Sequence, residues 1–321
     1  MKLTLPSLLT VLLLSMIACE SEIKQEFPQY SKVPITEPQL FAPDIISTQE
    51  ANEFELGFSA DGYTVYFSRR REGEKQKIHI STFDGTYWSR PVVADFSTDR
   101  DETVCITPDG KYLYFGSERP IPGKPNLGGF DMNIWQMTKD STGHWGNPTP
   151  LPSPINEVQA EGENWPSSNN NLFFTNNGED FYYTTKVRGD YTMRLFKVKK
   201  QGDGFSKPEQ IDGLFENDST WIYSAVITPD DKYLLFNTFE APEGVGGEDL
   251  YASKRTDSGW SRARSIKVLN TKDEESSARF SRDGKYFFFT RAENLGNYEY
   301  GPWNIYYMDT SALGLEELFD D

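Results

Sequence analysis

The sequence has few of the residues that most metal centres and disulfide scaffolds require. Among its 321 residues there are only two Cys and two His. Two cysteines are too few for a disulfide framework or a Cys₄ zinc site, and two histidines exclude sites that need several imidazole ligands. A Gly-x-Ser-x-Gly elbow, a phosphate-binding glycine loop and a His-Glu-x-x-His motif are also missing. Motifs therefore assign no catalytic residue.

Positive charge is scarce as well. The chain has 32 Lys and Arg against 49 Asp and Glu, a formal net charge of −17 at pH 7. Because nucleic acids and anionic membrane surfaces are themselves negative, this charge argues against both as partners. Aromatic residues, in contrast, make up 14% of the chain. Together with the chain length, they predict a folded protein with a substantial core.

Residues 1–18 predict a cleavable signal peptide. Lys2 precedes an apolar run at residues 8–14 that is too short to span a membrane. The run ends in Met16-Ile17-Ala18-Cys19, which resembles the lipobox of bacterial lipoproteins. The resemblance implies that Cys19 is lipidated and that the protein is an outer-membrane lipoprotein of the cell envelope, periplasm-facing or surface-exposed. A signal peptide that contains a cysteine by coincidence is the alternative.

The segment that follows, residues 19–40, is polar and acidic at its start, and we interpret it as a flexible tether. The membrane is then contacted through the lipid anchor only. With Cys19 carrying lipid, Cys105 is the one remaining thiol, so an intramolecular disulfide is excluded.

From residue 41 onward, one pattern recurs: an apolar strand, an Asp-Gly turn and an aromatic strand. Copies occur at residues 58–67, 106–115, 227–236 and 280–289, and residues 167–174 form a degenerate copy with its turn at Asn170. Asp-Gly between apolar runs is a strong hairpin signal, because Gly supplies the positive φ of tight turns. A Trp-Ser-x-Pro element or a variant of it begins at Trp88, Trp145, Phe205 and Trp260. Its proline is typical of edge strands.

A third strand lies between these two elements, so each unit has four antiparallel strands. This predicts an all-β fold, a β-propeller of four-stranded antiparallel blades. The turns indicate five blades; six is the alternative, because residues 172–200 contain additional strand-like segments. The chain ends without its last outer strand, while an orphan copy at residues 41–46 precedes the first hairpin. We expect this N-terminal strand to complete the last blade. The propeller then spans residues 41–309, followed by an acidic tail at 310–321.

The best copy of the hairpin, Thr-Pro-Asp-Gly-Lys-Tyr-Leu-Tyr-Phe at residues 107–115, resembles the PD40 repeat, the WD40-like repeat of TolB-type propellers. Gly-Gly-x-Asp at residues 128–131 and 246–249 looks like the same family. The resemblance covers about residues 41–309 and implies an envelope-associated binding or scaffolding module. It implies no particular activity, since the fold carries many functions.

The inner strand of each blade is called a and the outermost strand d. The tight a–b and c–d turns share one face of the ring, and the long b–c loops open on the other. Binding residues concentrate on long loops carried by a rigid scaffold, so the b–c face is the candidate site. The predicted binding residues at the channel mouth and on this face are Glu55, Glu102, Glu163, Glu275, Arg119, Arg291, Tyr298, Tyr300 and Trp303.

These carboxylates, if they converge on the mouth, suit a divalent cation, a basic peptide or sugar hydroxyls. Apart from that cation, no cofactor is expected. Alternatively, the acids pair with the arginines as rim ion pairs, and the aromatic residues pack between blades. The leading hypothesis is a monomeric, non-enzymatic module that binds an envelope protein, a peptide or a glycan. The alternative is a glycan-cleaving enzyme that uses two carboxylates about 5–10 Å apart.

Overall fold

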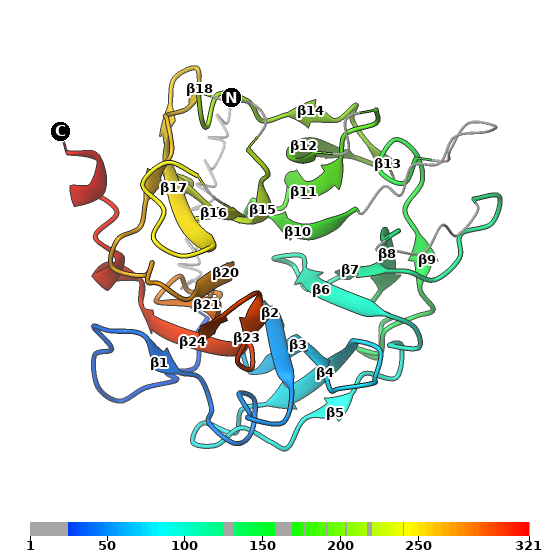
Figure 1. Ribbon diagram of the computed structural model, residues 1–321. Helices are drawn as coiled ribbons and strands as arrows, with labels where there is room; N and C mark the ends of the chain where they lie inside the picture. The colour runs from blue at the N-terminus through cyan, green and yellow to red at the C-terminus, as the bar shows by residue number, and fades with distance from the viewer. Residues whose placement is uncertain are drawn as a thin grey trace, which may run out of the picture.

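The computed structural model describes residues 25–124, 131–157, 169–175, 177–189, 192–202, 204–216, 220–239 and 241–320. The signal peptide, Cys19 and Glu163 lie outside the described residues. Within the described part, five antiparallel sheets surround one axis, and short 3₁₀ turns follow the last strand (Figure 1). No helix of that part has the length and hydropathy needed to cross a membrane. The all-β, five-bladed propeller predicted from the repeats is confirmed.

Each blade runs from an inner strand at the axis to a two-residue outer strand. Blade 1 contains β2 (Asn52–Phe58), β3 (Thr64–Arg70), β4 (Lys77–Thr82) and β5 (Val92–Val93), and blade 2 contains β6 (Asp101–Ile106), β7 (Tyr112–Ser117), β8 (Asn133–Thr138) and β9 (Thr149–Pro150). Blade 3 contains β10 (Asn170–Phe174), β11 (Asp180–Lys186), β12 (Met193–Gln201), β13 (Gly204–Phe205) and β14 (Glu209–Gln210). Blade 4 contains β15 (Tyr223–Ile227), β16 (Tyr233–Phe239), β17 (Glu248–Thr256), β18 (Gly259–Trp260) and β19 (Arg264–Ser265).

Blade 5 joins the two ends of the chain. It contains β20 (Glu274–Phe280), β21 (Tyr286–Ala292), β24 (Asn304–Asp309) and, as its outer strand, β1 (Gln39–Leu40). Gln39 is opposite Tyr307 and Leu40 opposite Tyr306, and the Phe41 N–H donates to the Ile305 carbonyl oxygen at 2.8 Å. The N-terminal strand therefore closes the ring as expected. It lies at residues 39–40, directly before the predicted span 41–46.

The turn of blade 3 differs from the prediction. Asn170 begins the inner strand β10, and the a–b turn lies at Thr175–Gly178, where Asn177 replaces the Asp of the other turns. The Thr175 hydroxyl donates to Asn177 Oδ1 at 2.6 Å, as the Thr107 hydroxyl does to Asp109 Oδ1 in blade 2. The additional strand-like segments at 172–200 are β11 and β12 of this blade, which is why the ring has five blades and not six.

The described segments before β1 and after β24 both pack onto the ring. The expected flexible tether differs from the structure over its described part, because Ile35 is fully buried and the Tyr30 ring lies 5.2–6.2 Å from six other aromatic rings. The acidic tail forms η1 (Thr310–Leu313) and η2 (Glu317–Phe319). Leu313 is buried, and the Phe319 ring stacks on Tyr233 at 5.7 Å. Aromatic and aliphatic residues within these polar segments supply that packing.

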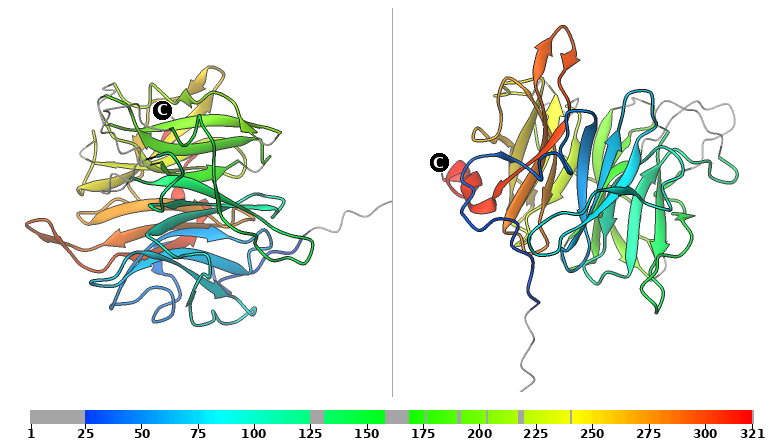
Figure 2. Two further views of the ribbon diagram at one scale, coloured as in Figure 1. Left: turned by 90° about the vertical axis from the view of Figure 1, so that its right-hand side faces the viewer. Right: turned by 90° about the horizontal axis from the view of Figure 1, so that it is seen from below.

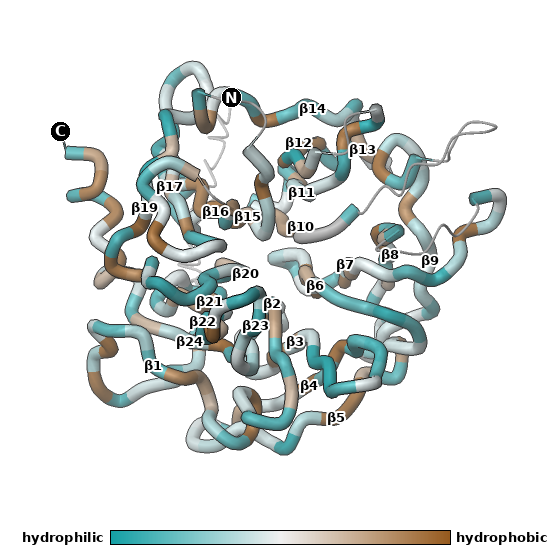
Figure 3. Tube along the Cα trace, viewed as in Figure 1, coloured by the Kyte–Doolittle hydropathy of each residue, from teal (hydrophilic) through white to brown (hydrophobic). Residues whose placement is uncertain are grey.

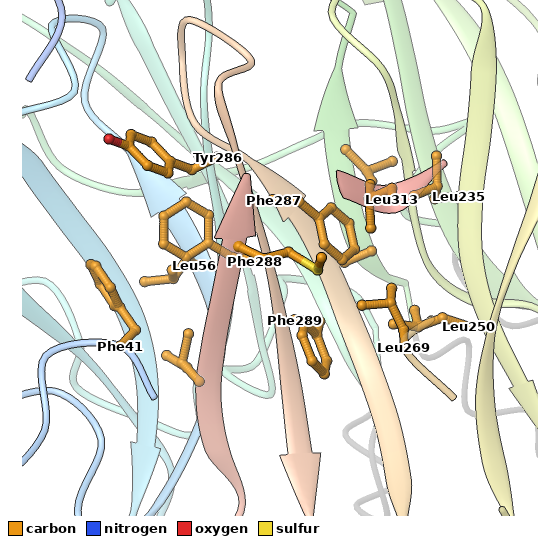
Figure 4. Packing of buried hydrophobic residues seen from close by; sticks show 14 of the residues in the cluster. Phe41, Leu56, Leu235, Leu250, Leu269, Tyr286, Phe287, Phe288, Phe289 and Leu313 are labelled. Carbon is orange, nitrogen blue, oxygen red and sulfur yellow. The ribbon is translucent and has the colours of Figure 1, made fainter. Parts of the chain in front are cut away.

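The core consists of side chains packed between neighbouring blades. Strands such as β21 read as continuous aromatic runs because a blade contacts a neighbour on each of its faces. Between blades 5 and 1, Phe41 contacts Phe288 edge to face at 5.0 Å, and on the other side Phe287 and Phe289 pack towards Leu235 and Leu269 (Figure 4). Burying each such side chain contributes about 1.5–3 kcal/mol.

The inner strands share one irregularity. In blades 1, 2, 4 and 5 the residue at the same position has a positive φ: Glu55 (54°), Thr103 (52°), Ser224 (38°) and Ser277 (59°). At this point the ladder to the next strand shifts register, as in a β-bulge. At two of these bulges the backbone N–H donates to a side chain of the preceding blade: Thr103 to the Glu55 carboxylate and Ser277 to Asn237 Oδ1.

Candidate functional site

The two faces of the ring are different. The a–b turns lie on the face from which the N-terminal segment leaves, and the β22 (Asn294–Gly296) and β23 (Glu299–Tyr300) hairpin projects from the opposite, b–c face (Figure 2). The b–c connection of blade 1, residues 71–76, is strongly hydrophilic (Figure 3). The predicted site residues that the structure describes are placed below relative to these loops.

Most of the predicted charged residues take part in buried ion pairs within one blade. Glu275 Oε1 accepts from Arg291 Nε at 2.8 Å, and the Glu275 side chain is fully buried. Both carboxylate oxygens of Asp101 accept from Arg119 Nη2, at 2.9 and 3.0 Å. In blade 1, Glu53 accepts from Arg69 Nε at 2.9 Å. Each arginine also donates to a backbone carbonyl of the preceding d–a connection. The pairs therefore fix these connections.

The energetics of these pairs are dominated by burial. Burial raises the pKa of the Glu53 carboxyl to about 7, although Thr48 and Arg69 oppose the shift. Burial also raises the pKa of Glu275, against the lowering effects of Thr271 and Arg291. Because taking both ions out of water costs several kcal/mol, such pairs contribute little net stability, but removing one partner strongly destabilises the fold.

Glu55 and Glu102 have different structural partners. Glu55 Oε2 accepts from the Thr103 backbone N–H at 3.1 Å, which joins the inner strands of blades 1 and 2 at the bulge. Glu102 Oε2 accepts from Gln76 Nε2 at 2.8 Å and from Arg100 Nη2 at 2.9 Å. Both glutamates are buried. Of the predicted carboxylates that the structure describes, Glu102 and Glu275 thus pair with arginines of their own blades, as in the ion-pair alternative, and Glu55 links blades 1 and 2.

A metal-binding set is likewise not formed by the described carboxylates. Across the described part of the chain, no group of three or more His, Cys, Asp or Glu side chains comes together in a way that could hold a metal ion. Glu163 is outside that part, so the divalent-cation expectation stays a prediction.

The predicted aromatic residues lie together on the b–c face. Tyr298 is 94% exposed at the tip of the β22–β23 hairpin, where Asn297 and Tyr298 both have a positive φ, as in a type I′ turn. Tyr300 is 42% exposed and lies 6.2 Å from the Trp303 ring. Trp303 is half-buried against Phe54 of β2 at 5.8 Å. Trp303 therefore supports the base of the hairpin, and the two tyrosines face solvent.

A cleft of about 440 Å³ adjoins Tyr300. Its walls are Tyr300–Pro302, the d–a connection at residues 49–52 and the b–c connection from Arg70 to Glu74. The lining combines one aromatic ring with Arg70, Arg71 and Glu72. A cleft with an aromatic wall and charged groups of both signs suits a polar, extended ligand.

Blade 4 contributes a second exposed aromatic group to this face. Trp221 is 39% exposed and Phe239 is 46% exposed. Tyr223 lies between them, 6.0 Å from Trp221 and 5.5 Å from Phe239. Tyr223 and Phe239 were not predicted as site residues, because each sits at the end of a strand whose other residues are core. Their position at the b–c end of β15 and β16 was the available signal.

Between the two aromatic groups lies a pair of buried acids, Glu248 and Glu274. Burial raises the pKa of Glu248 well above its ordinary range, and the nearby Glu274 charge raises it further. Glu248 Oε1 accepts from Asn237 Nδ2, and Asn294 Nδ2 donates to Glu274 Oε1 at 2.9 Å. The raised pKa means that Glu248 is more readily protonated than an ordinary glutamate. This pairing depends on contacts between blades 4 and 5.

The Gly-Gly-x-Asp motif at residues 246–249 explains how this pair is covered. A Cβ on Gly246 would lie 2.0 Å from the Asp273 carbonyl oxygen, and one on Gly247 would lie 2.8 Å from the Glu274 carboxylate. The Asp249 carboxylate accepts from the Val245 N–H at 2.8 Å. Glycine is needed because the b–c loop passes directly over the d–a connection. At this copy the motif is structural; in the other copy, positions 128–130 are outside the described residues.

A larger hollow, about 740 Å³, lies away from the b–c face. It separates the outer parts of blades 1 and 2 and is lined by Tyr66, Trp145 and the exposed His144, among others. Arg119, at the start of the b–c loop of blade 2, reaches its edge, but most of its lining consists of strand residues and the c–d turn at residues 143–148. We therefore place the candidate site on the b–c face, where loops from several blades meet.

Comparisons with known proteins agree with the fold. No protein-family model and no curated protein matches the sequence. Among solved structures, a glycoside hydrolase is 10% identical, with a TM-score of 0.56 over 86% of this chain and 91% of that one. TolB from Acinetobacter baumannii is 14% identical over 82% of this chain, with a TM-score of 0.48. An endo-arabinase from Bacteroides thetaiotaomicron is 13% identical over 87% of this chain and 96% of that one, also with a TM-score of 0.48.

These similarities extend over most of this chain, but it spans only about half (53%) of the length of TolB. At 10% identity, the similarity to the glycoside hydrolase shows a shared fold and nothing about activity. Because one fold can carry unrelated functions, the function has to be argued from the site.

Proposed function

We propose that this protein is a monomeric, lipid-anchored propeller of the outer envelope that binds a glycan or a peptide segment on its b–c face, without catalysis or a cofactor. The observation that supports this most directly is the exposed Tyr298 and Tyr300 beside the 440 Å³ cleft. Exposed aromatic rings stack on sugar rings and anchor peptides at little conformational cost. The hairpin that carries them is braced by Trp303, so the rings are presented on a rigid base.

If Cys19 is lipidated, contacts of the N-terminal segment orient this face. Gln25 Nε2 donates to the Ala60 carbonyl oxygen at 3.1 Å, and the Tyr30 hydroxyl donates to the Gly62 carbonyl oxygen at 2.7 Å. Both acceptors are in the a–b turn of blade 1. Gln25 is six residue steps from a lipidated Cys19, and six steps extend at most about 20 Å. Lipidation would hold the a–b face near the membrane and turn the b–c face away from it.

Anchoring and orientation have separate tests. Cys19→Ser should release soluble or unprocessed protein; a variant that stays membrane-bound at mature size would contradict lipidation. For orientation, a donor dye is attached to the Tyr87→Cys variant or to the Tyr298→Cys variant. Tyr87 lies in the c–d turn of blade 1. The labelled protein is anchored in vesicles that contain an acceptor lipid. Stronger energy transfer from position 87 is expected. Stronger transfer from position 298 would reverse the proposed orientation while leaving lipidation intact.

Binding is tested on arrays of envelope oligosaccharides and peptides. Tyr298→Ala and Tyr300→Ala should each weaken a bound ligand about tenfold, since an interface aromatic contributes roughly 1–2 kcal/mol. Tyr87→Ala removes a tyrosine that is 74% exposed on the opposite face and should leave affinity unchanged. Equal losses in all three variants, or none in the first two, would contradict the proposal.

A second candidate function, carboxylate-dependent glycan cleavage, is favoured by Glu248 and Glu274. A glutamate with a raised pKa can serve as a general acid, and its neighbour can serve as the partner carboxylate. Both are covered by the Gly246–Gly247 loop, so this function requires the loop to open. Turnover of any oligosaccharide that is lost in Glu248→Gln would establish it. Binding without turnover across a broad panel would contradict glycan cleavage and leave binding as the function.

A further inference from the structure

The central channel contains two arginines from one blade, the buried Arg279 and the half-buried Arg282. The positions equivalent to Arg279 in β2, β6, β10 and β15 hold Gly57, Cys105, Phe173 and Val226. The position of Arg282, directly after the first residue of the a–b turn, holds Ala60 in blade 1 and Pro108 in blade 2. Arginine is thus specific to blade 5 and is not required by the repeat. Figure 1 shows the five inner strands that surround this channel.

Arg282 closes one end of the channel. Its Nη2 donates to the carbonyl oxygens of Phe58 at 2.9 Å and Ile106 at 2.6 Å, and its Nε donates to the Ser59 carbonyl oxygen at 3.1 Å. These acceptors belong to blades 1 and 2, so the side chain reaches across the axis at the a–b face. Within the described residues, its hydrogen-bond acceptors are all backbone carbonyls, and the Asp61 charge acts on it without forming an ion pair.

Arg279 lies deeper and is incompletely bonded. It is 6% exposed; its Nη1 donates to the Ala278 carbonyl oxygen at 2.8 Å, and its Nη2 is buried without a hydrogen-bond partner. Among the described residues, no carboxylate lies within ion-pairing distance of Arg279 or Arg282. The Glu55 carboxylate opposes the lowering of the Arg279 pKa by desolvation, but it forms no ion pair with Arg279 and is already bonded to Thr103.

Both arginines line a cavity of about 80 Å³ whose other walls include Leu56, Phe173 and Val226. The cavity has room for more than one water molecule. Cys105 also borders it, and its thiolate would be an internal counter-charge. Burial raises the pKa of the Cys105 thiol, however, so it remains neutral. A buried guanidinium without a counter-charge is costly, because desolvation removes several kcal/mol of hydration.

We propose that this cavity is a binding site for a small monovalent inorganic anion of halide size, held by Arg279 and faced by Arg282. The anion satisfies Nη2 of Arg279 and neutralises charge at the point where all five inner strands meet. The apolar walls and the few donors favour a weakly hydrated monovalent ion over phosphate, which needs several more hydrogen bonds. The site joins the blades at the axis and is separate from the b–c face.

The experiment compares melting of the full-length protein in chloride and in gluconate, which is too large for the cavity, at equal ionic strength. Chloride should raise the melting temperature saturably, by about 3 °C. Arg279→Met should abolish this increment and, in gluconate, melt at or above the wild-type temperature, because the uncompensated charge is gone. The control Arg71→Met removes an exposed arginine and should keep the increment.

Bromide-soaked crystals provide a readout that does not depend on a variant that folds. An anomalous peak in contact with Arg279 Nη2 is expected. The absence of any such peak, or identical wild-type melting in chloride and gluconate, would overturn the proposal. Destabilisation of Arg279→Met by the same amount in both salts would also overturn it, since that result indicates a purely structural arginine.

Discussion

The Tyr30 hydroxyl donates a 2.7 Å hydrogen bond to the carbonyl oxygen of Gly62, in the a–b turn of blade 1. The Tyr30 ring fills the space between blades 5 and 1, where it contacts Phe58, Tyr286 and Phe288. This residue therefore does two things at once: it supports the closure of the ring and it holds the N-terminal segment on the a–b face.

Removing the Tyr30 ring should destabilise the propeller. Tyr30→Ala is expected to lower the free energy of unfolding by about 3 kcal/mol, because it leaves a cavity among six aromatic rings. Tyr30→Phe keeps the ring and should cost only about 1 kcal/mol, the value of one hydrogen bond. Denaturant unfolding measures both. An unchanged midpoint in Tyr30→Ala would mean that the segment is not held on the ring.

The Glu275–Arg291 pair predicts a pH-dependent defect. Arg291→Met leaves Glu275 buried without its cation, and about 3 kcal/mol of stability should be lost at pH 8. The pKa of Glu275 is already raised by burial and rises further without Arg291. A raised folded-state pKa makes stability fall as pH increases above the unfolded value of about 4.5, so the loss should be smaller at pH 5.

The control for that pair is Arg71→Met, whose ion pair with Glu74 is exposed. It should lose less than about 0.5 kcal/mol at either pH. If Arg291→Met resembled this control, Arg291 would not be a structural residue and would remain a candidate for ligand contact.

His79 should destabilise the fold in acid. Its ring is buried against Phe67 at 5.8 Å, and burial lowers its pKa to about 4. The unfolded histidine titrates near 6.5, so the unfolded state binds the proton first and stability falls as pH drops through this window. By pH 4 the loss is about 3 kcal/mol. His79→Gln should remove this contribution and His144→Gln, on the surface, should not. Equal acid sensitivity of both variants and the wild type would rule out a contribution of His79 to the loss of stability in acid.

The fold was predictable because its main signal is local. The a–b turns form within five residues of sequence. In these turns a hydroxyl, such as that of Ser59 or Thr107, donates to the carboxylate two residues later. The a–b turn of blade 3 was predicted at the wrong residue, Asn170, because Asn177 replaces the aspartate of the other turns. The packing of Tyr30 and Ile35 was missed for a related reason: two apolar side chains in a polar segment look like a tether until the groove that receives them is known.

The site was less predictable, because it depends on which residues meet across strands. Glu275 is opposite Arg291 in the ladder, and that register, rather than the acidic composition, decides that the carboxylate is buried and paired. The spacing of 16 residues in Glu53–Arg69 and in Glu275–Arg291 was a usable signal. The Glu248–Glu274 pair had no such signal, since it forms between two blades.

Photo-crosslinking in intact cells tests most directly whether the b–c face does the binding. Benzoylphenylalanine replaces Tyr298 on that face or, as the matched control, Tyr87 on the opposite face; both side chains are mostly exposed, at 94% and 74%. Protease and glycosidase sensitivity then separates peptide adducts from glycan adducts. We predict discrete adducts from position 298 and none from position 87. Adducts from position 87 alone, or from neither position, would contradict the proposed function.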